Sequence, residues 1–199
     1  MTSLLIGEGS SDNSIGDNVV AIMVANTTSL LDQLARKICK IGLISKGDEI
    51  VIASENHLAN VTTWLSVAKM VGAKIRWWTV TNDTCRDGRQ RQEKAESLCI
   101  LSDLINAKTK VVAISHVSNI LGQTRDVESA CNLVRRVTSN RGQVVVDGVA
   151  AAPHLLCTGL SSNGTAAGGG PDWYVVSLHT MFGPHLGCLV GEQSSVVDM

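Results

Sequence analysis

The feature that most constrains the fold is a repeated alternation of short apolar runs with longer segments of helical spacing. The apolar runs are rich in Val and Ile, which is typical of buried strands. The predicted strands are Asn18–Val24, Glu49–Ala53, Lys74–Val80, Lys110–Ser115, Gln143–Asp147, Trp173–Ser177 and Gly187–Val190. The predicted helices between them are Leu30–Ile41, Asn60–Val71, Glu96–Asn106 and Val127–Val137.

This alternation predicts right-handed βαβ units and therefore a doubly wound α/β fold with a mostly parallel, seven-stranded sheet. Too few residues join the sixth and seventh strands for a crossover, so we expect the last strand to be antiparallel. Two polar stretches interrupt the pattern and are predicted to be surface loops: Asn82–Ala95 and Ser161–Gly170.

Composition narrows the class of protein. The chain has 199 residues and a net charge of −1, which gives no reason to expect nucleic acid or an acidic membrane surface as a partner. No stretch approaches the ~20 apolar residues of a membrane span, and the N-terminus lacks the pattern of a secretory signal. The six cysteines are scattered without a CxxC pair, which favours reduced thiols over disulfides or a metal site. We therefore expect a cytoplasmic protein.

The segment Pro171–Gly187 (PDWYVVSLHTMFGPHLG) carries the clearest sign of a ligand site. A buried strand ends there in Ser177-Leu178-His179, and a glycine and a proline then force a turn. Such a strand presents a hydroxyl and an imidazole at the carboxyl edge of the sheet, where open α/β folds bind ligands. Both residues also have a plainer interpretation as turn residues.

Four further polar residues follow other predicted strands. Thr28 begins the first helix, His57 follows the second strand, Asn119 follows the fourth and Asp147 ends the fifth. Each has an ordinary alternative: a helix cap for Thr28 and Asp147, a cap or surface position for His57, and turn chemistry for Asn119. In a doubly wound sheet these strand ends converge on one crevice, so together the residues predict a site.

The sequence resembles class V aminotransferases and cysteine desulfurases, which are pyridoxal-phosphate (PLP) enzymes of fold type I. Successive blocks carry the resemblance over about Val19–Gly191, in the family's order: GDEIVIASENHLANVTTWL, GAKIRWW, TKVVAISHVSNILGQ, VVVDGVAAAPH and SLHTMFGPHLG. The RWW and GPHLG details are most similar to a cysteine-desulfurase-like subfamily. The resemblance implies that Thr28, Ser177 and His179 hold the phosphate, His57 stacks on the ring, Asp147 pairs with the pyridinium nitrogen and Asn119 contacts the phenolic oxygen.

Two positions depart from the family's pattern. The lysine that forms the Schiff base with PLP is replaced by Thr180, and no lysine occurs after Lys110. A threonine hydroxyl can neither form an imine nor act as the base that moves a substrate proton. A glutamine usual in the family is replaced by Ala150. Because position 180 is a threonine, we expect no catalytic residue there.

The resemblance also sets expectations about domain layout and partners. We expect a flexible lead-in over residues 1–18, a large domain over 19–191, a tail over 192–199 and no small C-terminal domain. The first hypothesis is a catalytically impaired domain that binds PLP non-covalently, as a homodimer or a heterodimer with a full-length relative. The alternatives are a non-catalytic interaction or regulatory subunit, a PLP enzyme for amino-acid substrates completed by a partner chain, and an unstable fragment.

Overall fold

The computed structural model describes residues 19–79, 90–155 and 170–192. Seven strands form one sheet in the order β1-β7-β6-β5-β4-β2-β3. The strands are β1 (Val19–Val24), β2 (Glu49–Ala53), β3 (Lys74–Trp78), β4 (Thr109–Ser115), β5 (Gln143–Asp147), β6 (Trp173–Ser177) and β7 (Gly187–Glu192). The helices are α1 (Thr27–Lys40), α2 (Ala59–Val71), α3 (Gln90–Leu104) and α4 (Val127–Thr138), with a 3-10 turn, η1, at His179–Met181.

The doubly wound, mostly parallel sheet is confirmed. Strands β2 to β6 pair in parallel, whereas β7 is antiparallel to both of its neighbours, β6 and β1. The prediction of an antiparallel last strand is therefore correct. Because β7 runs against both neighbours, β1 and β6 point the same way, and their carboxyl ends lie at the same edge of the sheet.

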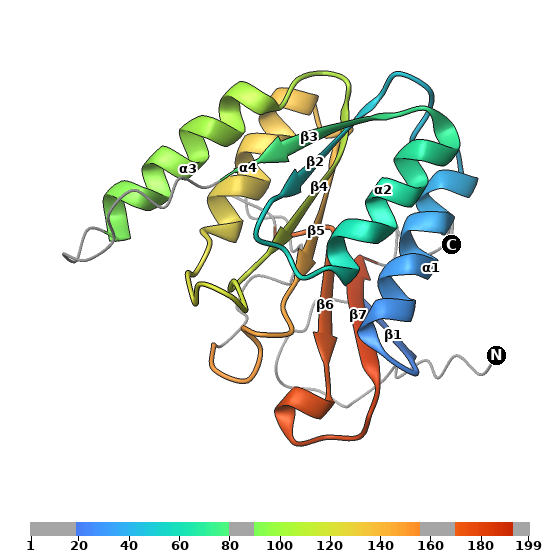
Figure 1. Ribbon diagram of the computed structural model, residues 1–199, viewed down its shortest axis with the longest axis vertical. Coiled ribbons are helices and arrows are strands. Elements are labelled where there is room, and N and C mark those ends of the chain that lie inside the picture. The colour runs from blue at the N-terminus through green and yellow to red at the C-terminus, as the bar shows by residue number, and fades with distance from the viewer. Residues whose placement is uncertain (1–18, 80–89, 156–169, 193–199) are drawn as a thin grey trace.

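Two hydrophobic cores lie on opposite faces of the sheet, and each is covered by a pair of helices. Helices α1 and α2 lie side by side over one face, and α3 and α4 cover the other (Figure 1). The first core contains Leu31, Leu34 and Trp64, and the second contains Trp78 and Leu101. Strand residues alternate between these cores, so the position of a residue along its strand determines which helices its side chain faces.

Helix α1 begins at Thr27, three residues before its predicted start at Leu30. Asn26 is the N-cap, because its side-chain oxygen accepts a hydrogen bond from the Ser29 amide at 2.8 Å. Helix α2 ends at Gly72 in the left-handed conformation that glycine favours.

The predicted start of the third helix is wrong. Helix α3 begins at Gln90, within the stretch predicted to be a loop up to Ala95. Residues 90–95 (QRQEKA) are good helix formers, but their high polarity is equally typical of a surface loop. The rest of that predicted loop, most of the Ser161–Gly170 loop and the predicted lead-in lie outside the described residues, as do residues 193–199 of the predicted tail.

The predictions about cysteines and membrane spans can be compared with part of the chain. Four cysteines lie in the described residues as free thiols, namely Cys39, Cys99, Cys131 and Cys188. Cys85 and Cys157 lie outside the described residues. Among the helices described, none has the length and apolar character needed to cross a bilayer.

Candidate site at the carboxyl edge of the sheet

Three polar side chains share one face of the sheet at its carboxyl edge. Ser115 lies directly opposite Asp147 in the β4–β5 register, and Ser177 ends the next strand, β6. The residues two positions before them, Ala113, Val145 and Val175, all belong to the core beneath α1 and α2. Since alternate residues of a strand share a face, Ser115, Asp147 and Ser177 also face the α1/α2 side.

Asp147 is the most unusual of these side chains. It is 6 % exposed, and its Oδ1 accepts a hydrogen bond from the Val149 amide at 3.0 Å. Within the described residues, Oδ2 has no hydrogen-bond partner. Burial raises the pKa of the carboxyl above its ordinary value, and the Val149 hydrogen bond and the nearby His57 oppose this shift. A largely buried carboxylate with one oxygen free of protein hydrogen bonds is a fitting partner for a cationic nitrogen.

The start of α1 packs closely against the end of β6 and the start of β7. The Thr27 hydroxyl donates to the Val176 carbonyl at 3.4 Å. A side chain on Gly187 would place its Cβ 2.6 Å from the Thr27 nitrogen, so only glycine permits this approach. Within the described residues, the amides of Thr27 and Thr28 have no hydrogen-bond partner, as is usual for a helix N-terminus.

Two predicted phosphate ligands are sequence neighbours of the residues that form this corner. Thr28 is exposed in the first turn of α1, and Ser177 follows Val176, the acceptor of the Thr27 hydroxyl. Free amides at a helix N-terminus next to hydroxyls form an arrangement suited to an anion. His179 is exposed in η1, and its ring stacks on His185 with 3.9 Å between the centroids.

Thr180 occupies the position next to His179, within η1. Its hydroxyl lies 2.8 Å from the Ser177 carbonyl oxygen and 3.3 Å from the Val149 carbonyl oxygen. The side chain is exposed and ties the turn to the end of β6 and to the segment after β5. It therefore has a local structural contact, and it carries no amine.

The charge of His57 acts on the Asp147 carboxyl and lowers its pKa against the larger, opposite effect of burial. The His57 ring is exposed in the loop between β2 and α2, and its Nδ1 accepts a hydrogen bond from the Ala59 amide at 3.2 Å. His57 and Asp147, which are 90 positions apart in the sequence, thus influence one another electrostatically.

Asn119 is not joined to the other candidates by any hydrogen bond or ion pair in the described residues. It is exposed in the loop after β4, which turns at Gly122 with a φ of 68°. The Ser118 hydroxyl accepts hydrogen bonds from the amides of Ile120 and Leu121 and so shapes this turn. Ala150, where the resemblance predicts a glutamine in other family members, lies in the turn that follows β5.

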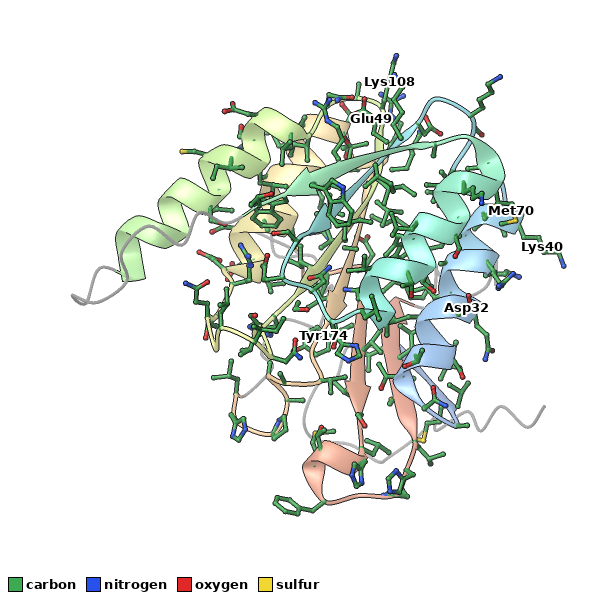
Figure 2. The ribbon with its side chains drawn as sticks, viewed as in Figure 1. Asp32, Lys40, Glu49, Met70, Lys108 and Tyr174 are labelled. Atoms are coloured by element: carbon green, nitrogen blue, oxygen red, sulfur yellow. The ribbon has the colours of Figure 1, made fainter. Side chains whose placement is uncertain are left out.

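The sequence did not single out three features at this edge. Ser115 beside Asp147 could have been found from the alternation of strand residues. His116 Nδ1 lies 2.8 Å from the Tyr174 hydroxyl on the α3/α4 side. Arg125 pairs with Glu55, and no local pattern connects two residues 70 positions apart. Glu49 and Lys108 lie at the other end of the sheet, far from the η1 loop (Figure 2).

Solved structures share this arrangement of strands and helices. The cysteine desulfurase CsdA from Escherichia coli superposes with a TM-score of 0.72 at 24 % identity, over 90 % of this chain and 40 % of that chain. A cystine C–S lyase, C-DES, solved with its product cysteine persulfide, gives a TM-score of 0.67 at 22 % identity, over 90 % and 43 %. The fold is therefore that of the fold type I PLP-dependent enzymes.

Sequence comparison identifies the family. The profile of the aminotransferase class-V family matches residues 16–199. A probable cysteine desulfurase from Halalkalibacterium halodurans is 31 % identical over 179 residues, and the aminotransferase-like protein FGM3 from Gibberella zeae is 29 % identical over 180. Each match covers 89 % of this chain and 39 % of the relative, so the chain spans about two-fifths of these relatives. The chain belongs to the class V aminotransferase family and is cysteine-desulfurase-like.

Proposed function

We propose that this domain binds PLP without a covalent tether and that it is impaired as a PLP enzyme. The observation that carries the proposal is the burial of the Asp147 carboxylate in a chain that has Thr180 where the resemblance predicts the family's lysine. Asp147 supports recognition of a pyridinium nitrogen. Thr180 offers no amine for attachment.

The residues at the carboxyl edge fit the chemical groups of PLP. Thr28, Ser177 and His179 would hold the phosphate, together with the free amides at the start of α1. Asp147 would pair with the ring nitrogen, His57 would stack on the ring and Asn119 would donate to the phenolic oxygen. The packing of Thr27 on Val176 supports a phosphate corner, because it places Thr28 and Ser177 at one end of the sheet.

Bound PLP supplies an electron sink for substrate carbanions, and the protein must supply proton transfer. Here the residue at position 180 cannot do so. A threonine hydroxyl is not ionised at neutral pH, so it offers no alkoxide that could accept the substrate proton. In this structure the hydroxyl is directed at backbone carbonyls. Asp147 would hold a protonated ring nitrogen only while its own carboxyl is ionised. The chain therefore retains recognition groups and lacks the group that moves the substrate proton.

Titration of the purified protein with PLP and with pyridoxamine phosphate tests this proposal. Pyridoxamine phosphate has no aldehyde, so a non-covalent site binds both compounds with similar affinity. Asp147→Asn should weaken both by about tenfold, as expected for one lost charged contact of ~1.4 kcal/mol. The control Asp103→Asn removes an exposed carboxylate from α3 and should change neither. Absence of saturable binding to the folded wild-type protein would refute the proposal.

A second function, pairing with another class V chain, is favoured by apolar side chains in the loops at the same edge. Ile120 is 73 % exposed, Leu58 is 67 % exposed and Phe182 is fully exposed. They lie in the loops after β4, β2 and β6, and such exposure is typical of interaction sites. Light scattering tests this function: a dimer should dissociate in the Ile120→Ser/Phe182→Ser variant. A wild-type monomer that binds no class V chain would contradict it.

A further inference from the structure

The guanidinium of Arg125 is enclosed by groups from three other segments of the chain. The side chain is 9 % exposed and forms an ion pair with the Glu55 carboxylate. Its Nη1 donates to the Ser97 hydroxyl at 2.8 Å, and its Cζ lies 4.7 Å from the centre of the Trp78 ring. Arg125 thus joins the β2–α2 loop, the end of β3 and helix α3 to the β4–α4 loop, to which it belongs.

Glu55 depends on this contact. It is buried in the loop after β2, and its carboxylate has no hydrogen-bond partner in the described residues apart from its ion pair with Arg125. Removing two charges from water is costly, and a well-packed apolar pair of similar volume is often at least as stable. A buried ion pair is therefore weak evidence for a role in stability. A role in fixing the orientation of the two loops that it joins is the alternative.

The backbone around Arg125 closes the loop that carries Asn119. The Arg125 amide donates to the His116 carbonyl at 2.8 Å, and the Ser118 amide donates to the Gln123 carbonyl at 3.0 Å. A β-bridge between Val117 and Thr124 lies between these two contacts. The loop is therefore a closed hairpin with Arg125 at its base, so its orientation depends on where that base is held.

The backbone around Glu55 leads directly to His57. The intervening residue, Asn56, donates its side-chain amide to the Ala113 carbonyl of β4 at 2.9 Å. The Ser54 amide donates to the Trp78 carbonyl at 3.0 Å. Glu55 thus lies between two backbone anchors, and the Arg125 guanidinium is its side-chain connection to the Asn119 loop.

We propose that the Glu55–Arg125 ion pair is a positioning device that fixes the loop carrying His57 relative to the loop carrying Asn119. This inference rests on the proposed function, in which His57 stacks on the PLP ring and Asn119 donates to its phenolic oxygen. The pair touches neither cofactor nor substrate. It sets the separation of the two ring contacts and leaves the phosphate corner at α1, β6 and β7 unaffected.

The test replaces the pair with apolar groups of similar size, Glu55→Leu/Arg125→Met. Single variants would leave an uncompensated buried charge and are strongly destabilising. We expect the double variant to keep the wild-type denaturation midpoint while amide hydrogen exchange rises at least tenfold in residues 54–60 and 116–125. PLP should bind about tenfold more weakly. Inorganic phosphate, measured as a competitor of PLP, should bind as it does to the wild type.

Two further variants complete the comparison. Arg125→Lys keeps the charge and loses the planar fork, so it should give intermediate exchange rates, and it serves as the test variant if the double variant does not fold. Arg36→Met removes the exposed ion pair that Arg36 forms with Asp32 at 2.8 Å and should change nothing.

Each result decides between positioning and a purely structural role. Wild-type exchange rates in both loops of the double variant would overturn the inference, as would equal weakening of PLP and phosphate. If the wild-type protein binds no PLP, the proposed function fails. Hydrogen exchange then decides alone whether the ion pair fixes the two loops.

Discussion

The Thr180 hydroxyl donates a hydrogen bond to the Ser177 carbonyl oxygen across 2.8 Å, and this contact fastens the η1 turn to the end of β6. The resemblance predicts the family's lysine at this position, and in this chain the Thr180 side chain bonds to the local backbone. The same turn carries His179, so Thr180 holds the segment of one proposed phosphate ligand.

Thr180→Val should show that this hydrogen bond is local. The variant keeps a similar volume and loses the hydroxyl, so the free energy of unfolding should fall by about 0.5–1 kcal/mol. PLP affinity should change less than twofold, because Thr180 contributes no tether. Urea denaturation and a PLP titration measure the two quantities. A loss of binding much larger than the loss of stability would assign Thr180 a direct contact with the cofactor.

Asp147→Asn should trade binding for stability. Burial raises the pKa of Asp147 above the ordinary 3.8. Between 3.8 and the raised pKa the native state binds more protons than the unfolded state, so stability falls as pH rises through this window. The variant lacks this loss. It should unfold at higher urea concentration than the wild type at pH 7, and the difference should shrink as pH falls toward 3.8. PLP binding should weaken at pH 7.

The matching prediction for the wild type concerns pH and PLP. As Asp147 takes up a proton on acidification, its attraction for a pyridinium nitrogen disappears and PLP should bind more weakly. In Asp147→Asn this pH dependence should be smaller. Identical pH profiles for the two proteins would show that Asp147 does not contact the ring nitrogen.

Gly187→Ala should disturb the phosphate corner. The new methyl group would lie 2.6 Å from the Thr27 nitrogen, so α1 must move away from β7, at a cost of about 1–3 kcal/mol. PLP and inorganic phosphate should both bind more weakly. The control is Gly42→Ala, which strains a residue with a φ of 77° but meets no atom within 4 Å. It should lower the midpoint of thermal unfolding and leave both affinities unchanged. Equal affinities in Gly187→Ala and wild type would remove α1 from the proposed site.

Most of the fold could be predicted because each strand is a short, self-contained signal. The runs Glu49–Ala53, Gln143–Asp147 and Trp173–Ser177 coincide with β2, β5 and β6. The antiparallel last strand followed from the short connection after β6. The start of α3 was missed because QRQEKA is equally typical of a polar loop and of an exposed helix.

The site was predictable only as a set of strand ends. Topology predicts Thr28, His57, Asp147 and Ser177 at one edge. The structure adds the hydrogen bond from Thr27 in α1 to Val176 in β6 and an electrostatic effect of His57 on Asp147. Asn119 was predicted in the same way and has no hydrogen bond to the others in the part of the chain described. The Glu55–Arg125 pair could not be foreseen, since it depends on how two loops approach in space. The roles of these residues toward PLP remain predictions.

Borohydride treatment followed by mass spectrometry tests most directly whether PLP binds without a covalent tether. It is applied to PLP-loaded wild-type protein and to PLP-loaded Thr180→Lys. We expect saturable PLP binding by the wild type with no PLP fixed to the chain, and one PLP fixed at position 180 in the lysine variant. Thr180→Met, which has a side chain of similar length without an amine, should behave as the wild type. A PLP adduct on one defined lysine of the wild-type protein would contradict non-covalent binding, because the cofactor would then have a covalent tether elsewhere.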